Sequence, residues 1–358
     1  MYKPASVLTY TFSHFCVDFA CFFMLFYSFF RQDYTIRVVT IGFLLYNVIA
    51  FGLQPIIGYI CDIKKHIPAG LIGCLTVLAG ILLIELSWAS LILCAFGNAC
   101  FHVGGGIDSL VYSNGKMFRS GLFVSSGALG VVFGTIFGKG ENIIIVIPVI
   151  MLALCCLLII FFAPVQKPDY KVLSFSNTSV TLSFTFVLLL CFVSIVIRSY
   201  VGSITPIVWK TTIFLMVLPA IGACIGKASG GLLADIFGAK NVGVATLLAS
   251  IPFLLFGSHQ VVPCMIGIIL FNMTMPITLC AIANKLPDNP GLAFGATTLC
   301  LLCGNMPTFY YALPGTLVKP VTAVLILISA ACIYCSIKNQ KGGFIYEKTV
   351  QKAESHSV

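Results

Sequence analysis

Uninterrupted apolar runs of about 20 residues recur along the whole chain, the length that spans a bilayer as an α-helix. Backbone groups in lipid must be hydrogen-bonded within their own segment, and continuous runs achieve this only as helices. The strands of a membrane barrel would instead alternate apolar and polar residues over about 10 positions. The chain is therefore expected to be an all-α polytopic membrane protein, surrounded by the lipid bilayer.

The composition favours the same fold class. Hydrophobic residues make up 59% of the 358 residues, only 9% are charged, and the mean hydropathy is +1.07. We attribute the net charge of +9 to positive loops rather than to nucleic-acid binding. The sixteen cysteines lie nearly all inside apolar runs, where a thiol behaves as a small hydrophobe. We expect no cofactor, no metal and no nucleic-acid partner.

Twelve transmembrane helices are predicted, in two six-helix bundles. They lie near 6–30, 38–62, 66–86, 88–111, 118–138, 142–163, 180–202, 211–234, 239–257, 261–284, 290–314 and 318–337. The predicted domains are an N-terminal bundle over residues 1–163, a cytoplasmic linker over 164–179, a C-terminal bundle over 180–337 and a cytoplasmic tail over 338–358.

The positive charges predict an orientation. With both termini in the cytoplasm, thirteen lysines and arginines fall on the inner side and five on the outer side. Positive residues concentrate in cytoplasmic loops, so this assignment is favoured. We expect a multi-pass monomer in the cell membrane, plasma or inner, with both termini cytoplasmic.

Two related polar stretches stand half a chain apart. They read "GYICDIKKH" from Gly58 to His66 and "GLLADIFGAK" from Gly231 to Lys240, and each follows the second helix of its predicted half. A repeat at half-length is typical of transporters built from two related bundles. Glycine allows two helices to approach closely, and the acid can pair with cations or with the positive N-terminus of a neighbouring helix.

Both stretches resemble the signature cytoplasmic loop of the major facilitator superfamily. The matching positions, which we expect to form a conformational latch, are Gly58, Asp62, Gly231, Asp235, Gly238 and Lys240, together with Lys65, which stands where glycine is usual. Further fragments are similar to the fosmidomycin-resistance-like exporter group of that superfamily: "SHFCVDF", "NACFH", "RSYVGSITP" and "KLPDNPGLAFG".

The resemblance implies a secondary active transporter that moves a small solute by alternating access, and not an enzyme. The resemblance favours an efflux antiporter for drug-like or metabolite compounds, and our hypothesis is that transport is coupled to protons. Nutrient uptake and a non-transporting membrane sensor on the same scaffold are the alternatives. In the superfamily the first, fourth, seventh and tenth helices line a central cavity, which places His14, Asp18, His102 and Arg198 around one aqueous pathway.

These rare ionisable residues are the candidate site, because charges at membrane depth are costly and mark functional positions. His14 and Asp18 are four residues apart and share a helix face, so they are expected to bind the coupling proton, or to form a structural pair. Arg198 is expected to attract an anionic group or close an outer gate, unless it extends to the interface. The small residues Gly127, Gly130, Gly134 and Gly138 are expected to pack a helix closely against a neighbour.

Overall fold

The computed structural model describes residues 3–30, 34–140, 144–163, 170–175 and 183–338. The first half contains α1 (Pro4–Phe30), α2 (Ile36–Gly52), α3 (Gln54–Ile63), α4 (Ala69–Leu82), α5 (Ser87–Val111), α6 (Met117–Lys139) and α7 (Val146–Phe162). The second half contains α8 (Phe184–Ile204), α9 (Ile213–Phe237), α10 (Ala239–Phe256), α11 (Val261–Asn272), α12 (Thr274–Lys285), α13 (Pro290–Asn305), the 3₁₀ turn η1 (Met306–Phe309) and α14 (Gly315–Ser336).

The described helices make up twelve apolar segments. Ten are long and apolar enough to cross a membrane when α2 is counted with α3, α11 with α12 and α13 with η1. The other two, α4 and α7, are shorter apolar helices. The all-α class is confirmed, and the differences lie at boundaries: α4 ends at Leu82 and not near 86, and helical structure after α13 ends at Phe309 and not near 314.

Two of the predicted helices are interrupted by proline. Pro55 lies in the first turn of α3, and its missing N–H cannot bond to the carbonyl of the preceding turn. Pro276 lies in the first turn of α12 and has the same effect where α11 ends. At each break one helix ends and the next begins two residues later.

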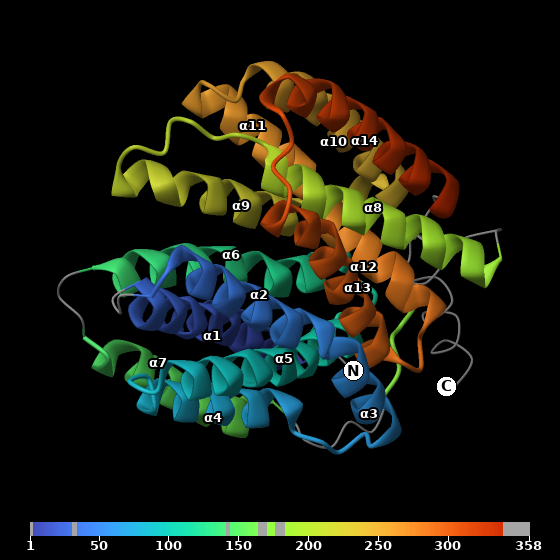
Figure 1. The fold of residues 1–358 in the computed structure, drawn as a ribbon. Helices are drawn as coiled ribbons and strands as arrows, with labels where there is room; N and C mark the ends of the chain where they lie inside the picture. The colour runs from blue at the N-terminus through green and yellow to red at the C-terminus, as the bar shows by residue number, and fades with distance from the viewer. Residues whose placement is uncertain (1–2, 31–33, 141–143, 164–169, 176–182, 339–358) are drawn as a thin grey trace, which may run out of the picture.

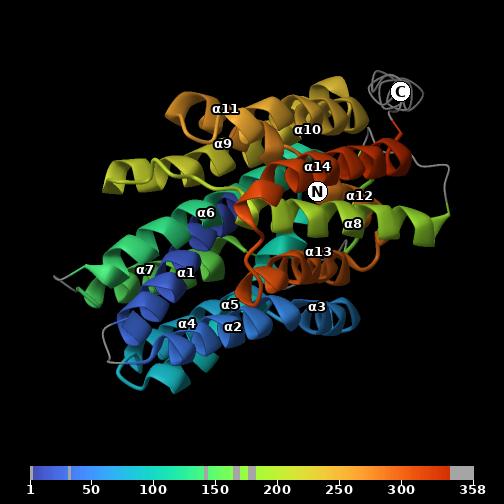
Figure 2. The same cartoon turned by 45° about the horizontal axis from the view of Figure 1, so that its top comes forward.

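The helices form two bundles, α1–α7 and α8–α14, which lie one above the other in Figure 1. Within the first bundle α1 packs along α6 and α4 along α5, and within the second α8 and α10 pack against α14. Across the bundles, α6 lies beside α9 and α3 lies beside α13 (Figure 2). In addition, α13 contacts α2 and α5, and α12 contacts α6. The bundle architecture agrees with the prediction, while the boundaries at 163, 179 and 337 stay predictions.

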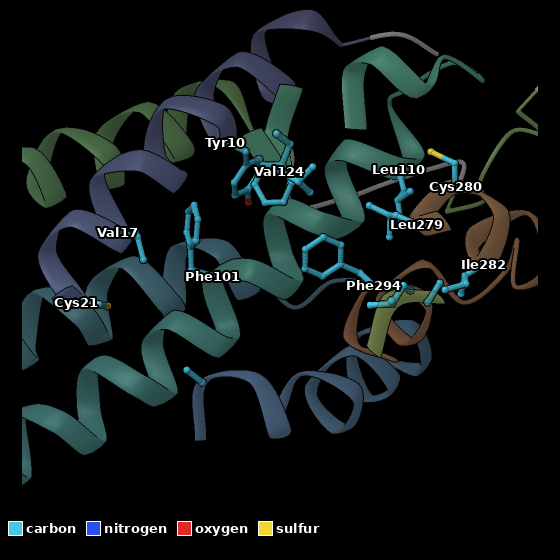
Figure 3. Packing of buried hydrophobic residues seen from close by; sticks show 14 of the residues in the cluster. Tyr10, Val17, Cys21, Phe101, Leu110, Val124, Leu279, Cys280, Ile282 and Phe294 are labelled. Atoms are coloured by element: carbon cyan, nitrogen blue, oxygen red, sulfur yellow. The ribbon is translucent and has the colours of Figure 1, made fainter. Parts of the chain in front are cut away.

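The buried core continues from one bundle into the other. Figure 3 shows Phe294 of α13 and Leu279 of α12 beside Leu110 of α5. The rings of Phe123 and Phe294 approach to 5.9 Å between centroids across the bundle boundary. These contacts lie toward the end of the molecule where α3 and α9 end, which we call the motif end because both signature stretches are there.

Part of the predicted linker packs against this end. Of residues 164–179 the structure describes 170–175, in which Tyr170, Val172 and Phe175 are buried. The Val172 amide donates to Pro287 O at 2.9 Å, and the Phe175 amide donates to Asn284 Oδ1 at 3.0 Å. The segment is thus hydrogen-bonded to the end of α12 and to the loop that follows it. The predicted tail after Lys338 lies outside the described residues.

Candidate functional site

Four polar side chains of α1 and α5 meet inside the first bundle, and we call them the histidine cluster: His14, Asp18, Asn98 and His102. His14 Nε2 lies 2.8 Å from His102 Nε2 and 3.2 Å from Asp18 Oδ2. The Asn98 amide donates to Asp18 Oδ1 at 3.0 Å, and His102 Nε2 is 3.7 Å from that oxygen. Each helix contributes residues four positions apart, which share a face. The structure therefore brings together three of the predicted site residues.

The hydrogen bonds of the two imidazoles determine how many protons the rings carry. His14 Nδ1 lies 2.7 Å from Phe123 O, and His102 Nδ1 lies 2.9 Å from Asn98 O. A carbonyl oxygen only accepts, so each Nδ1 donates a proton. The bond between the two Nε2 atoms needs a third ring proton, one more than two neutral imidazoles have. The observed geometry thus corresponds to one imidazolium, one neutral imidazole and the Asp18 carboxylate.

Glycines of α6 make room for this arrangement. A Cβ atom at Gly127 would collide with Asp18 Oδ2 and His14 Nε2. Gly130 and Gly134 lie in the same way against the backbone of α1, and a Cβ at Gly138 would lie 2.6 Å from Phe23 O. The four predicted packing glycines therefore occupy the α1–α6 contact, where small residues allow two backbones to approach.

The cluster is closed from bulk water in this arrangement, whereas the sequence led us to expect groups that line an aqueous pathway. His14, Asp18 and His102 are 6%, 8% and 6% exposed. The ring of Phe123 lies 4.8 Å from the His14 ring, centroid to centroid, and the ring of Phe101 lies 6.4 Å from it. The surroundings are therefore apolar, and the charges of the cluster are balanced chiefly within it.

The ligand-type atoms of His14, Asp18 and His102 all lie within 4.8 Å of one another, so the group could hold a metal ion by distance alone. Both Nδ1–H groups donate to carbonyls, as they commonly do in metal-binding histidines. However, two nitrogen ligands of one tetrahedral zinc ion would lie about 3.3 Å apart. The observed 2.8 Å between the Nε2 atoms is a hydrogen-bond distance, and it fits a shared proton better.

Arg198 lies on α8 in the second bundle and is 6% exposed. Its Nη1 donates to Thr278 Oγ1 on α12 at 3.2 Å, so the side chain points into the protein and does not extend to the membrane interface. It does not join the histidine cluster. Lys227 on α9 is half-buried and lies within electrostatic reach of Arg198, Asp18 and His102.

Asp62 of the first motif joins the two bundles. Its Oδ1 and Oδ2 accept hydrogen bonds of 2.8 Å from the Gly291 and Leu292 amides at the start of α13. The carboxylate thereby satisfies unbonded N–H groups at the positive end of a helix. The Tyr170 hydroxyl also donates to Asp62 Oδ1 at 2.8 Å. Burial raises the pKa of Tyr170, and the Asp62 charge raises it further, so the phenol remains a donor at neutral pH.

Asp235 of the second motif makes the equivalent contact in the opposite sense. Its two oxygens accept from the Met117 and Phe118 amides at the start of α6, each at 3.0 Å. Lys116 and Arg119 lie within electrostatic reach of the same carboxylate. Each motif acid thus caps a helix of the other bundle.

The remaining motif residues support these two contacts. Gly58 meets the backbone of Gly291, and a Cβ at Gly231 would lie 2.7 Å from Met117 O, so only glycine fits at either position. Gly238 has φ +89°, a conformation that favours glycine, and turns the chain from α9 into α10. Each motif lysine also lies over an aromatic ring: Nζ of Lys65 is 5.6 Å from the Tyr170 centroid, and Nζ of Lys240 is 3.5 Å from the Tyr334 centroid.

A cavity of about 180 Å³ also lies at the motif end, lined by residues that include Tyr10, Lys65, Gly104 and Tyr170. It is lined by helices of the first bundle, by the loop between α3 and α4 and by Tyr170, and the histidine cluster does not line it. We therefore do not include it in the candidate site.

Two residues of the site were missed from the sequence. Asn98 lies one turn before His102, and this spacing on an apolar helix was an available signal. Tyr170 had no comparable signal, because it stands in a polar stretch that we predicted to be a linker. Its role follows only from the hydrogen bond to Asp62.

No protein-family model matches the chain, and no curated protein sequence matches it. Solved structures do. The human organic anion transporter MFSD10 matches with a TM-score of 0.68 and 14% identity over 93% of this chain and 99% of that one. A variant of the Escherichia coli fucose:proton symporter FucP matches with a TM-score of 0.62 and 14% identity over 94% and 98%. A structure of the major facilitator superfamily transporter FucP in the outward conformation matches with a TM-score of 0.56 and 14% identity over 92% and 97%.

At 14% identity these similarities establish the fold. The chain has the fold of major facilitator superfamily transporters over nearly its whole length, and its apolar helices make it a multi-pass membrane protein. The similar structures are those of transporters.

Proposed function

We propose that this chain is a secondary transporter that moves a small solute across the cell membrane by alternating access, and that the histidine cluster binds the coupling proton. The fold supplies two bundles that can move against each other around a site between them. The observation that carries the proposal is the extra proton required by the bonds among His14, His102, Phe123 and Asn98.

Loss of that proton would change the packing of α1 against α5. Without it, two nitrogen lone pairs would face each other at 2.8 Å, and the Asp18 carboxylate would be buried without a charged partner. A buried charge without a partner is strongly unfavourable, so the deprotonated cluster favours an arrangement that admits water. Protonation and conformation are coupled in this way.

The two motif acids act as latches at the motif end. Asp62 holds the start of α13 and Asp235 holds the start of α6, so each hydrogen-bonded pair crosses between the bundles. These bonds form in the state that is closed at the motif end and break when the bundles separate there. From the distribution of lysine and arginine we place the motif end, and both termini, in the cytoplasm.

Export and uptake are separated by the direction of the gradient that drives flux. The motifs resemble an exporter group, while the similar structures include a fucose:proton symporter and an organic anion transporter. In proteoliposomes, an exchanger accumulates solute when protons flow outward, whereas a symporter accumulates solute when protons flow inward with it. We favour export from the motif resemblance, and accumulation driven only by inward proton flow would overturn that choice.

The central test is Asp18→Asn in proteoliposomes, with a solute first identified by its effect on the Tm of the purified protein. Accumulation driven by a pH gradient is expected to be lost, while exchange of labelled for unlabelled solute without a gradient is retained. Glu85→Gln is the control, since Glu85 is an exposed carboxylate that bonds α1 through Tyr27 at 2.7 Å. Gradient-driven accumulation that survives in Asp18→Asn rejects the role of the cluster. Binding without any flux in the wild type would favour the sensor alternative.

A further inference from the structure

Two cations of the second bundle have no acidic partner. Arg198 Nη1 donates to Thr278 Oγ1, but Arg198 Nη2 is buried and has no hydrogen-bond partner among the described residues. Lys227 makes no hydrogen bond or ion pair with any other part of the chain that the structure describes, and it lies within electrostatic reach of Arg198. A pair of neighbouring positive charges at membrane depth is costly unless something neutralises them.

The protein offers no carboxylate for this purpose in the second bundle. Within residues 183–338 the acidic side chains are Asp235 and Asp288. Asp235 caps α6, and Asp288 lies 3.4 Å from Lys171 on the surface. Across the bundle boundary, Asp18 lies within electrostatic reach of Lys227, but its carboxylate already pairs with the two histidines.

The orientation of Arg198 is fixed by its neighbour. The Thr278 hydroxyl lies 3.2 Å from Thr274 O and from Met275 O, so its proton is directed to the backbone. Its oxygen is left as an acceptor for Arg198 Nη1. This bond holds one edge of the guanidinium and leaves Nη2 available for an oxyanion.

We propose that Arg198 and Lys227 together bind an anion, and that the transported solute carries an oxyanion group, a carboxylate or a phosphate ester. That the bound anion is transported rests on the proposed function, whereas anion binding itself does not require transport. Arg198 supplies a directed donor and Lys227 a point charge, a combination suited to one end of a small organic anion.

The first test needs no ligand. Because a cation without an acidic partner is costly at membrane depth, Arg198→Gln and Lys227→Met are each expected to raise the Tm of the purified protein in the absence of ligand. Arg37→Gln changes an exposed arginine of α2 and is expected to leave the Tm unchanged. Arg198→Lys keeps the charge and should show no such rise. A lower Tm for both Arg198→Gln and Lys227→Met would mean structural roles and would overturn the site.

The second test uses matched pairs that differ in charge: benzoate and benzamide, succinate and succinamide, glycerol 3-phosphate and glycerol. At least one anion is expected to raise the Tm of the wild type by about 2 °C or more above its neutral partner. That difference should disappear in Arg198→Gln, diminish in Lys227→Met and persist in Arg37→Gln. Comparison of the carboxylate pairs with the phosphate pair identifies the charged group that is bound. The proposal is overturned if no anion raises the Tm more than its neutral partner does.

Transport then separates the two hypotheses. Anion binding that requires Arg198 without flux in proteoliposomes supports the site and rejects the transporter function. Flux of a neutral solute that is unchanged in Arg198→Gln supports the transporter function and rejects the anion site.

Discussion

At the residue scale, the Tyr170 hydroxyl at the motif end contributes to folding stability and to its dependence on pH. It donates to Asp62 Oδ1 at 2.8 Å while Asp62 caps α13. Burial raises the pKa of Tyr170, and the charge of Asp62 raises it further. In the unfolded chain the phenol ionises near pH 10. Above that pH the folded protein therefore binds more protons than the unfolded chain, and folding stability falls as the pH rises.

Tyr170→Phe is expected to lower the Tm at pH 7, because a hydrogen bond to a carboxylate is worth roughly 1.5–3 kcal/mol. The same variant should lose less additional stability than the wild type between about pH 9.5 and 11. Thermal unfolding measured across this range checks both parts. Tyr311→Phe changes a tyrosine that is 61% exposed and should follow the wild-type curve. An equal alkaline loss in Tyr170→Phe and wild type would contradict the assignment.

At the scale of elements, the close contact of α6 with α1 depends on glycine. A Cβ at Gly134 would collide with Phe19 O and lie 2.9 Å from Phe23 N. Gly134→Ala is therefore expected to reduce the free energy of unfolding by about 1–3 kcal/mol, because one helix must move away from the other. Chemical denaturation in detergent measures this change.

The matched control for that substitution is Gly202→Ala on α8. Its Cβ would meet no atom within 4 Å, so alanine should leave stability unchanged or raise it by up to about 1 kcal/mol through helix propensity. Equal effects of the two substitutions would show that backbone entropy, and not the contact with α1, governs the response.

The positions of the helices could be predicted because each apolar run is long enough to cross a membrane. Their breaks and partners could not. Several prolines lie inside predicted helices, and the sequence does not show which of them interrupt the helix, as Pro276 does where α11 ends near Met273. The pairing of α6 with α9 leaves no amphipathic signal, because lipid-facing and protein-facing surfaces are both apolar.

At the scale of the whole molecule, the sequence predicted the part of the candidate site that is formed by side chains, but not the part formed by backbone groups. His14, Asp18 and His102 stood out because ionisable residues are rare in this chain, and the structure brings them together. For the contacts between the bundles, the sequence revealed the two acids but not the groups that they bind. The partners of Asp62 and Asp235 are backbone amides at helix starts, and a backbone donor has no sequence signal of its own.

The last prediction concerns the separation of the bundles at the motif end. An amide has one acceptor oxygen, so Asp62→Asn and Asp235→Asn each leave one backbone N–H unbonded and remove a charge from a helix N-terminus. If each substitution destabilises the closed state by about 1 kcal/mol, the double variant shifts the ratio of open to closed states by about thirtyfold. Cys280 of α12 is fully buried beside Ser120 of α6 and becomes accessible when the bundles part.

Labelling with N-ethylmaleimide, read by mass spectrometry of the Cys280 peptide, measures that opening. We expect labelling at least about tenfold faster in the double variant than in the wild type. Cys155 is buried within the first bundle and should stay unlabelled in both, which reports that the bundle remains folded. Asp288→Asn alters an exposed acid at the same end and should not change the rate. An unchanged rate at Cys280 in the double variant would show that the motif acids do not hold the bundles together, and closure would then depend on apolar contacts such as Phe123 with Phe294.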